Sequence, residues 1–268
     1  MDPTTPYVIV SLSGGKDSTA MLLGMLDRNE HIDEVLVCDT GMEFPAMYDH
    51  LNRLYKIINE NSIKLTVLKN ELSFIYYLKD APIKSEKYGD HYGYGWPSMN
   101  ARWCTKLLKL NLISKYIKDL KEQHPDIIQC VGLAFDEQER ANRDNNKNNR
   151  HPLIEWGWTE KDCLDYCYKR GYDWGGLYTI FKRVSCWCCP LASMEELKAL
   201  WWHYPDLWRK LCEWEIELSK PNKGKRGAYK FKDNLSVFDL TARFSKELET
   251  DCKILRFGTK QKTLKDVC

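Results

Sequence analysis

The chain has 268 residues and a formal net charge of +2, so it can bury a sizeable core, and its charge gives no global reason to expect nucleic acid as a partner. Its composition, 43% hydrophobic and 12% aromatic, excludes an intrinsically disordered protein. No apolar run approaches the ~20 residues that cross a membrane, and residues 1–6 lack the basic and apolar regions of a signal peptide. We therefore expect a cytoplasmic protein with no membrane partner.

The first predicted elements surround a glycine turn near the amino end. Residues 7–10 are a short β-branched and aromatic run typical of a buried parallel strand, and residues 19–26 have helical composition. A strand, a glycine turn and a helix in this order present backbone N–H groups and the positive end of a helix dipole at one point, where a phosphate binds. The turn consists of Ser13, Gly14, Gly15, Lys16, Asp17 and Ser18. A plain turn before a helix is the alternative, because the spacing is neither that of the Walker A loop nor that of the dinucleotide-binding loop.

Further strands and helices alternate along the chain. Strands are predicted at residues 34–39, 64–69 and 127–132. Helices are predicted to begin at Pro45 and to occupy residues 104–124, whereas residues 70–100 are expected to be a loop. This alternation predicts an α/β fold with a doubly wound, mainly parallel sheet covered by helices on both faces. Ligands bind such sheets at the carboxyl ends of the strands.

Composition divides the chain into two predicted domains. Residues 1–150 form the α/β domain, and residues 151–268 form a small helical region that carries a cysteine cluster and packs on it. The boundary follows a polar stretch, residues 142–150, which is expected to be a mobile loop or the margin of a lid. Beyond it, Thr159 and Ser193 are predicted to cap the N-termini of helices.

Eleven cysteines in a chain expected to be cytoplasmic do not indicate a disulfide framework. Cys38, Cys130 and Cys163 lie in apolar contexts and are expected to pack in the core. Three others crowd into four positions and, with one upstream, have the layout of a thiolate metal site. These four are Cys104, Cys186, Cys188 and Cys189. A 4Fe–4S cluster, a Zn²⁺ site and unligated packing are the alternatives. In a cluster, Cys188 would be the fourth ligand, or one iron would stay open to bind a sulfur substrate.

Five segments, in order, resemble the phosphoadenosine phosphosulfate (PAPS) reductase family, within the adenine nucleotide α-hydrolase superfamily of PP-loop ATP pyrophosphatases. They are SGGKDS (13–18), DTGMEFP (39–45), RWCTKLLK (102–109), GLAFDEQER (132–140) and YTIFKRVSCWCCP (178–190). HPLIEW (151–156) is similar to the Pro-Leu-x-x-Trp segment of the family. One departure is Ala134, which stands where many relatives have Arg.

The resemblance implies roles for particular residues. The nucleotide-binding residues would be those of the glycine turn together with Asp39, Thr40, Gly41, Gly132, Glu137 and Arg140. The catalytic residues would be Lys16, Asp17, Arg102 and Lys109. Arg102 and Lys109 suit the anionic part of the ligand. Asp17 would orient the loop or Mg²⁺, or would be a first-turn acid favoured by the helix dipole.

The resemblance leaves three activities open. An intact phosphate loop favours cleavage of ATP to AMP and pyrophosphate, coupled to sulfur transfer. The first alternative is a cluster-containing sulfonucleotide reductase that releases sulfite, although residues 263–268 lack the Glu-Cys-Gly-x-His motif of thioredoxin-dependent reductases. The second is a non-catalytic nucleotide-binding subunit with a structural metal.

The implied partners are ATP or a related adenine nucleotide with Mg²⁺, a sulfur donor protein or thiol reductant, and a second copy of the chain. Nucleic acid is the favoured sulfur acceptor. Residues 220–232 are basic and interrupted by glycine, and would contact a nucleic-acid backbone or form a solvated loop.

Overall fold

The computed structural model describes residues 5–86, 89–143, 146–219 and 230–258, with side chains to residue 250. The chain forms two compact units, Met1–Phe74 with Arg102–Trp187, and Ile75–Ala101 with Cys188–Cys268. Residue 150, where we expected a boundary, lies inside the first unit. The basic segment 220–232 is described only from residue 230, and residues 263–268 lie outside the described part.

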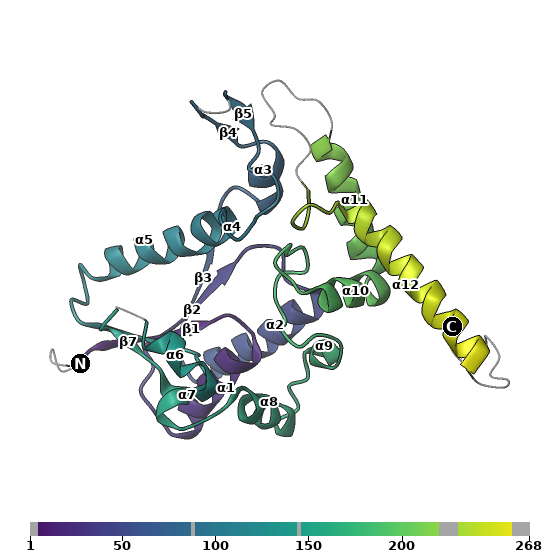
Figure 1. Ribbon diagram of the computed structural model, residues 1–268. Coiled ribbons are helices and arrows are strands. Elements are labelled where there is room, and N and C mark those ends of the chain that lie inside the picture. Colours follow the sequence, from purple (N-terminus) through teal and green to yellow (C-terminus); the bar gives the residue numbers. More distant parts are fainter. Residues whose placement is uncertain (1–4, 87–88, 144–145, 220–229, 259–268) are drawn as a thin grey trace. The chain divides into compact units, whose positions relative to one another are not determined.

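The first unit is built on a five-stranded sheet in the order β3-β2-β1-β6-β7 (Figure 1). The strands are β1 (Tyr7–Leu12), β2 (Glu34–Asp39), β3 (Lys64–Lys69), β6 (Ile127–Val131) and β7 (Asn149–Arg150). All neighbouring pairs are parallel, which confirms the predicted α/β sheet. The chain runs outward in opposite directions from β1, so the carboxyl ends of β1 and β6 form the switch point at which α/β sheets bind ligands.

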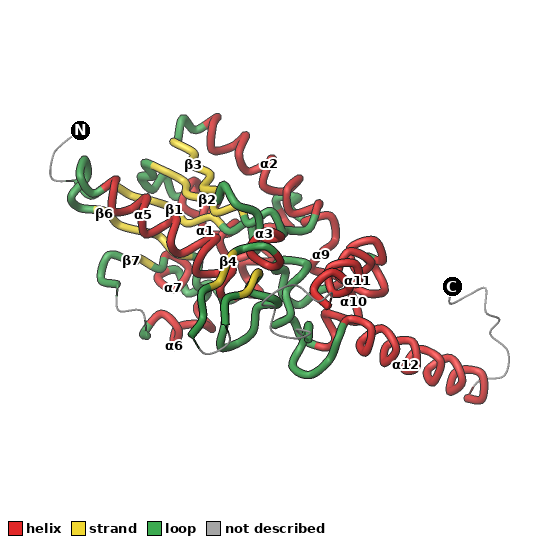
Figure 2. Tube along the Cα trace, turned by 90° about the horizontal axis from the view of Figure 1, so that it is seen from above, coloured by secondary structure: helices red, strands yellow, loops and turns green. Residues whose placement is uncertain are grey.

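Helices cover both faces of this sheet (Figures 1 and 2). On one face, α5 (Asn111–Leu120) packs Ile113 and Ile117 against a core cluster that includes Ile9 and Leu36. The opposite face carries α1 (Lys16–Asp27) and α2 (Pro45–Glu60). α2 begins at Pro45 as predicted, because the fixed φ of proline suits the first helical turn. The remaining helical elements of the unit are α4 (Trp103–Thr105), η1 (Lys106–Leu110), η2 (Phe135–Glu137), α6 (Gln138–Ala141), α7 (Pro152–Glu155), α8 (Glu160–Lys169), η3 (Trp174–Gly176) and α9 (Leu177–Ile180).

The sequence motifs predicted correctly where α8 begins, but they did not predict the short helix and the short strands described next. α8 begins at the predicted cap, where the Thr159 hydroxyl accepts from the Asp162 N–H and the Asp162 carboxylate accepts from the Thr159 N–H. The expected loop over residues 70–100 is wrong in part, since it contains α3 (Phe74–Lys79) and the strand pair β4 (Pro82–Ile83) and β5 (His91–Tyr92). The polar stretch 142–150 also ends in a strand, because β7 pairs with β6.

The second unit is mainly helical. Its long helices are α10 (Met194–His203), α11 (Pro205–Ser219) and α12 (Val237–Gly258). The predicted Ser193 cap is confirmed, with the Ser193 hydroxyl accepting from the Glu196 N–H at 3.1 Å. The Trp208 indole donates to the Thr241 hydroxyl at 2.9 Å, which joins α11 to α12. None of the helices in the described part of the chain combines the length and the apolarity needed to cross a membrane.

Candidate nucleotide-binding site

A cavity of about 580 Å³ opens at the carboxyl ends of β1, β2 and β6, at the switch point of the sheet. The predicted site residues that line it are Ser13, Gly15, Lys16, Asp17, Ser18, Lys109, Gly132, Glu137 and Arg140. Leu36, Ile113 and Leu133 add apolar wall. A cavity of this size with an apolar wall and convergent charged groups suits a nucleotide.

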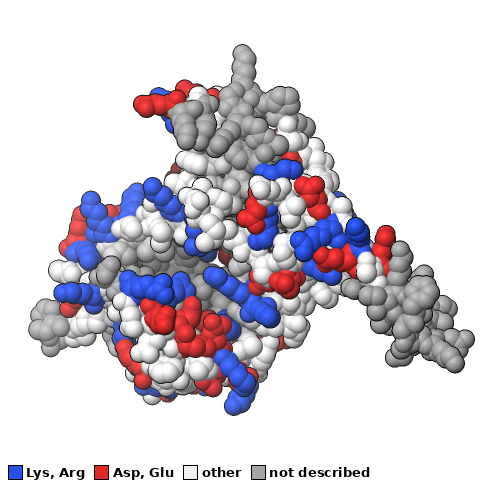
Figure 3. All heavy atoms as spheres, in the orientation of Figure 1, with Lys and Arg blue, Asp and Glu red and all other residues white. Residues whose placement is uncertain are grey.

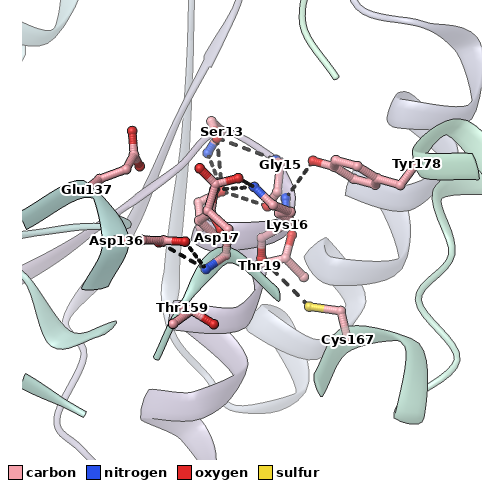
Figure 4. Close-up of polar contacts among 12 residues, drawn as sticks. Ser13, Gly15, Lys16, Asp17, Thr19, Asp136, Glu137, Thr159, Cys167 and Tyr178 are labelled. Atoms are coloured by element: carbon pink, nitrogen blue, oxygen red, sulfur yellow. Dashed lines mark hydrogen bonds and ion pairs between the residues drawn. The ribbon is translucent and has the colours of Figure 1, made fainter. Parts of the chain in front are cut away.

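The glycine turn forms a compact loop that leads directly into α1 (Figure 4). The Ser13 and Ser18 hydroxyls are 2.9 Å apart, and the Ser18 hydroxyl also accepts from the Ser13 N–H at 3.2 Å. Gly14 has φ +81°, and a Cβ there would lie 2.8 Å from the Met47 sulfur, so only glycine fits. These contacts fix the loop with the N-terminus of α1 at the cavity wall, where its dipole favours an anion.

A second close approach joins the loop to β6. A Cβ on Gly132 would lie 2.9 Å from both the N and the Cα of Ser18. The absence of a side chain at Gly132 therefore allows the end of β6 to pack directly against the first turn of α1. This contact brings the motifs at residues 13–18 and 132–140 to the same cavity.

A buried polar network binds the backbone of the loop at Gly14. The Trp174 indole donates to the Gly14 carbonyl at 2.7 Å, and the Thr19 hydroxyl donates to the same oxygen at 3.3 Å. Thr19 Oγ1 also lies 3.0 Å from Nε2 of His50, whose ring packs against Trp174. Burial lowers the pKa of His50 to about 4, helped by the nearby charge of Arg53, so this imidazole is neutral near pH 7.

Charged groups converge at the start of α1. The Lys16 ammonium lies 3.0 Å from Asp17 Oδ2 and 2.6 Å from Glu160 Oε2. Burial alone would lower the pKa of Lys16, but the two carboxylates outweigh it and raise that pKa above its usual range. Burial raises the pKa of Asp17, against the opposing effect of Lys16. The other oxygen, Asp17 Oδ1, is buried without a hydrogen-bond partner among the described residues.

Lys109 joins the cavity to a second polar cluster. The predicted helix over residues 104–124 contains the π-helical segment η1. The Cys38 thiol donates to the Leu108 carbonyl at 3.4 Å. Cys38 also lines the cavity instead of packing in the core as we predicted, whereas Cys130 and Cys163 are fully buried as predicted.

The second cluster lies around the Lys109 ammonium. Glu43 Oε1 is 3.9 Å from Lys109 Nζ, and the Cys186 thiol donates to the same oxygen at 3.5 Å. Cys186 also lies 3.7 Å from the Thr40 hydroxyl. Burial would lower the pKa of Lys109, yet Cys186 and Glu43, followed by Cys38 and Cys104, raise it. A thiol, a carboxylate and an ammonium thus lie together beside the cavity.

Several predicted site residues lie outside the cavity wall: Gly14, Asp39, Thr40, Gly41, Arg102 and Cys104. Asp39 is engaged locally, since its carboxylate accepts from the Gly41 N–H at 2.7 Å and from the Tyr48 hydroxyl at 2.9 Å. Burial would raise the pKa of Asp39, but these donors and Lys69 lower it. Arg102 is exposed and caps α4.

The four candidate metal ligands divide between the two units. Cys104 and Cys186 belong to the first, whereas Cys188 and Cys189 belong to the second. In the second unit, the Lys232 ammonium donates to the Pro190 and Ala192 carbonyls at 3.1 and 2.7 Å and closes the turn after the cysteines. Over the ranges that the structure describes, no group of three or more His, Cys, Asp or Glu side chains is arranged to hold a metal ion. The chemistry of the four candidate thiolate ligands suits iron–sulfur or zinc.

The structure adds cavity residues that the sequence analysis did not single out: Glu160, Tyr178, Lys182 and Arg183. The last three lie within the segment YTIFKRVSCWCCP, so the motif contained the signal, but no single residue in it stood out. Glu160 follows the predicted cap Thr159, and only the tertiary structure directs its carboxylate to Lys16. Glu43 was similarly part of a recognised motif without an assigned role.

The chain is similar in sequence to two uncharacterised proteins of one organism. MJ0066, an uncharacterised protein of Methanocaldococcus jannaschii, is 27% identical over 250 residues, which cover 84% of this chain and 46% of that protein. MJ0973, an uncharacterised protein of the same organism, is 28% identical over 213 residues, which cover 75% of this chain and 45% of that protein. The chain thus spans less than half the length of either relative.

Among solved structures, the U34-tRNA thiolase NcsA from Methanococcus maripaludis with its 4Fe–4S cluster is 12% identical, with a TM-score of 0.40 over 91% of this chain and 73% of that one. The phosphoadenosine phosphosulfate reductase domain model matches residues 7–192. That match spans the phosphate loop, the cavity and all five sequence motifs, and the chain belongs to the phosphoadenosine phosphosulfate reductase domain family.

Proposed function

We propose that this protein binds ATP in the cavity and cleaves it between the α and β phosphates in a sulfur-transfer reaction. The observation that carries the proposal is the phosphate loop, which lines the cavity beside an Asp17 oxygen that has no partner among the described residues. A substrate oxygen attacks the α-phosphorus, the bond to the bridging oxygen breaks, and pyrophosphate leaves with that electron pair. A sulfur nucleophile then displaces AMP from the adenylated substrate.

The residues of the cavity have definable roles in this scheme. The loop and the N-terminus of α1 bind the phosphate oxygens through hydroxyl and N–H donors, and Lys16 and Lys109 offset the charge of the departing pyrophosphate. Mg²⁺ fits this site, because Asp17 presents a buried carboxylate oxygen without a partner among the described residues, and carboxylate oxygen is a ligand that this ion prefers. When bound, it would supply further neutralisation of phosphate charge.

Sulfur chemistry is assigned to the cysteine side of the cavity. Cys186 lies beside Glu43 and Lys109, and Lys109 also lines the nucleotide cavity. A 4Fe–4S cluster or Zn²⁺ held by the four candidate cysteines is part of the proposal on residue type and spacing alone, and no step above depends on it. Sulfur reaches the site from a donor protein or a small thiol.

Nucleic acid is the proposed acceptor of sulfur. Lys182 and Arg183 line the same cavity as Arg140, and cations around a cavity suit a phosphate backbone. On the face drawn in Figure 3, positive and negative side chains are interspersed over the described residues, so backbone binding would depend on these local cations. The protein is proposed to act in the cytoplasm, with a second copy of the chain as a further partner.

The test is to identify the products. Anaerobically prepared protein is incubated with ATP, Mg²⁺ and a small thiol as sulfur donor, with and without bulk nucleic acid, or with labelled sulfonucleotide and a thiol reductant. We expect pyrophosphate and AMP from ATP, and at least about a hundredfold less from Asp17→Asn, which removes the charge but keeps the shape. Asp165→Asn, at an exposed carboxylate on α8, is the matched control and should retain activity.

Two results would contradict the proposal. Sulfite release from the sulfonucleotide without pyrophosphate from ATP would indicate a reductase. Tight nucleotide binding without turnover of either compound, with or without nucleic acid, would indicate a non-catalytic subunit.

A further inference from the structure

Tyr178 on α9 contacts the phosphate loop from a position 162 residues further along the chain. Its hydroxyl accepts from the Lys16 N–H at 2.9 Å (Figure 4). Its ring meets the ring of Trp174 edge to face at 4.8 Å, and Trp174 is itself bonded to the Gly14 carbonyl. Tyr178 lines the nucleotide cavity. Tyr178 and Trp174, which are four residues apart in the sequence, thus bind the backbone of the loop at Lys16 and at Gly14.

The hydrogen of the Tyr178 hydroxyl is the important group. A phenol has one hydrogen to donate and also accepts. Here the oxygen already accepts from Lys16, and no acceptor for its own hydrogen is found among the described residues. Burial raises the pKa of Tyr178 to about 12, so the hydroxyl keeps its hydrogen near neutral pH. This hydrogen is therefore available to a ligand in the cavity.

The N–H of Lys16 belongs to the first turn of α1, where such groups ordinarily bind a phosphate directly. In this chain the phenol oxygen takes that N–H and offers an O–H in its place. The group that can donate to a ligand is then the Tyr178 hydroxyl, which lies one hydrogen-bond length from the Lys16 N–H. A hydroxyl that already accepts a hydrogen bond is polarised and becomes a better donor to an anion.

We propose that Tyr178 is a phosphate-binding residue whose hydroxyl donates to a non-bridging oxygen of the nucleotide polyphosphate. The inference rests on the proposed function for the identity of the ligand. It assigns to α9 a part of the phosphate site that the glycine turn alone would not provide. The competing explanation is that Tyr178 only supports the loop through Lys16.

The experiment measures binding of an ATP analogue with a methylene group between the α and β phosphorus atoms, and of adenosine, by titration calorimetry. A hydrogen bond to a charged group corresponds to roughly ten- to a hundredfold in affinity, so Tyr178→Phe should weaken binding of the analogue by that factor. Adenosine has no phosphate, and its affinity should change by less than about twofold. Trp174→Phe is the support control, because it removes the bond to Gly14 without changing the cavity wall. It loosens the loop that is proposed to bind the phosphates, so it should also weaken binding of the analogue while the affinity for adenosine changes by less than about twofold.

A second replacement separates donation from support. O-methyltyrosine at position 178 keeps an oxygen that accepts from Lys16 but has no hydrogen to donate. It should weaken binding of the analogue as Tyr178→Phe does, and it decides the question if Tyr178→Phe does not fold. Unchanged affinity for the analogue in the replaced proteins, or equal losses for the analogue and adenosine, would overturn the role of Tyr178. If the unmodified protein binds neither ligand, the proposed function fails as well.

Discussion

The neutral histidine beneath the phosphate loop makes the stability of the protein depend on pH. His50 is 2% exposed, and its Nδ1 has no hydrogen-bond partner among the described residues. The Thr19 hydroxyl donates to the Gly14 carbonyl, so it accepts from Nε2 of His50. Protonation would therefore place a buried, charged N–H at Nδ1 without an acceptor. This cost is the physical reason for the low pKa of His50.

The magnitude follows from the two pKa values. The pKa of His50 is about 4 in the folded protein against an ordinary value of 6.5, and each tenfold change in proton affinity is worth about 1.4 kcal/mol. The unfolded chain binds this proton more readily, so folding stability is complete above pH 6.5 and falls as the pH is lowered toward 4. The loss from this one group is about 3 kcal/mol. His50→Gln carries an amide that can still donate to Thr19 but does not titrate in this range.

The assay is chemical unfolding of the full chain and of His50→Gln at several values between pH 7.5 and pH 4. Carboxylates contribute equally to both proteins, so the difference between the two curves isolates His50. We expect the free energy of unfolding of the unmodified protein to fall by about 3 kcal/mol more than that of His50→Gln over this range. Parallel curves would refute the reasoning and would mean that the imidazole is hydrated or paired when charged.

Two further predictions concern the loop and the cysteines. Gly132→Ala places a Cβ against Ser18, so it should lower the free energy of unfolding by roughly 1–3 kcal/mol and weaken binding of the ATP analogue. An unchanged unfolding midpoint and an unchanged affinity would contradict the close approach. If Cys186 is a cluster ligand, protein prepared anaerobically is brown and contains iron and sulfide. Cys186→Ala should lose the iron and sulfide, whereas Cys212→Ala, at a cysteine outside the candidate set, should retain them. Colourless protein that carries zinc would refute the cluster, and metal-free protein would refute both metals.

Much of the fold was predictable because its signals are local. The β-branched run over residues 7–10 and the similar runs at 34–39 and 64–69 predicted strands, and Pro45 and the Thr159 capping box located the starts of helices. Each of these preferences comes from steric or hydrogen-bonding restrictions on neighbouring residues, so it is present in the sequence itself. The short elements were not predictable in this way. β7 contains only Asn149 and Arg150, and it forms because β6 offers an open edge.

The candidate site likewise has residues that the local sequence identified and contacts that only the folded chain makes. The residues of the glycine turn were identifiable because their spacing and their position between a strand and a helix have a direct physical meaning. The contacts that complete the turn come from distant segments: Tyr178 and Trp174 bind its backbone, and Glu160 pairs with Lys16. Cys38 was assigned to the core on composition alone, whereas it lies near the carboxyl end of β2, lines the cavity and donates to the Leu108 carbonyl of η1.

The sequence by itself determined the parallel α/β sheet, the glycine turn and the family of the chain, since each depends on neighbouring residues or on ordered motifs. Only the tertiary structure decided which side chains meet at the cavity, and it placed Lys109 beside Glu43 and Cys186. The reason is that close approach over long separations depends on packing, such as the contact of Gly132 with Ser18, and packing is a property of the folded chain.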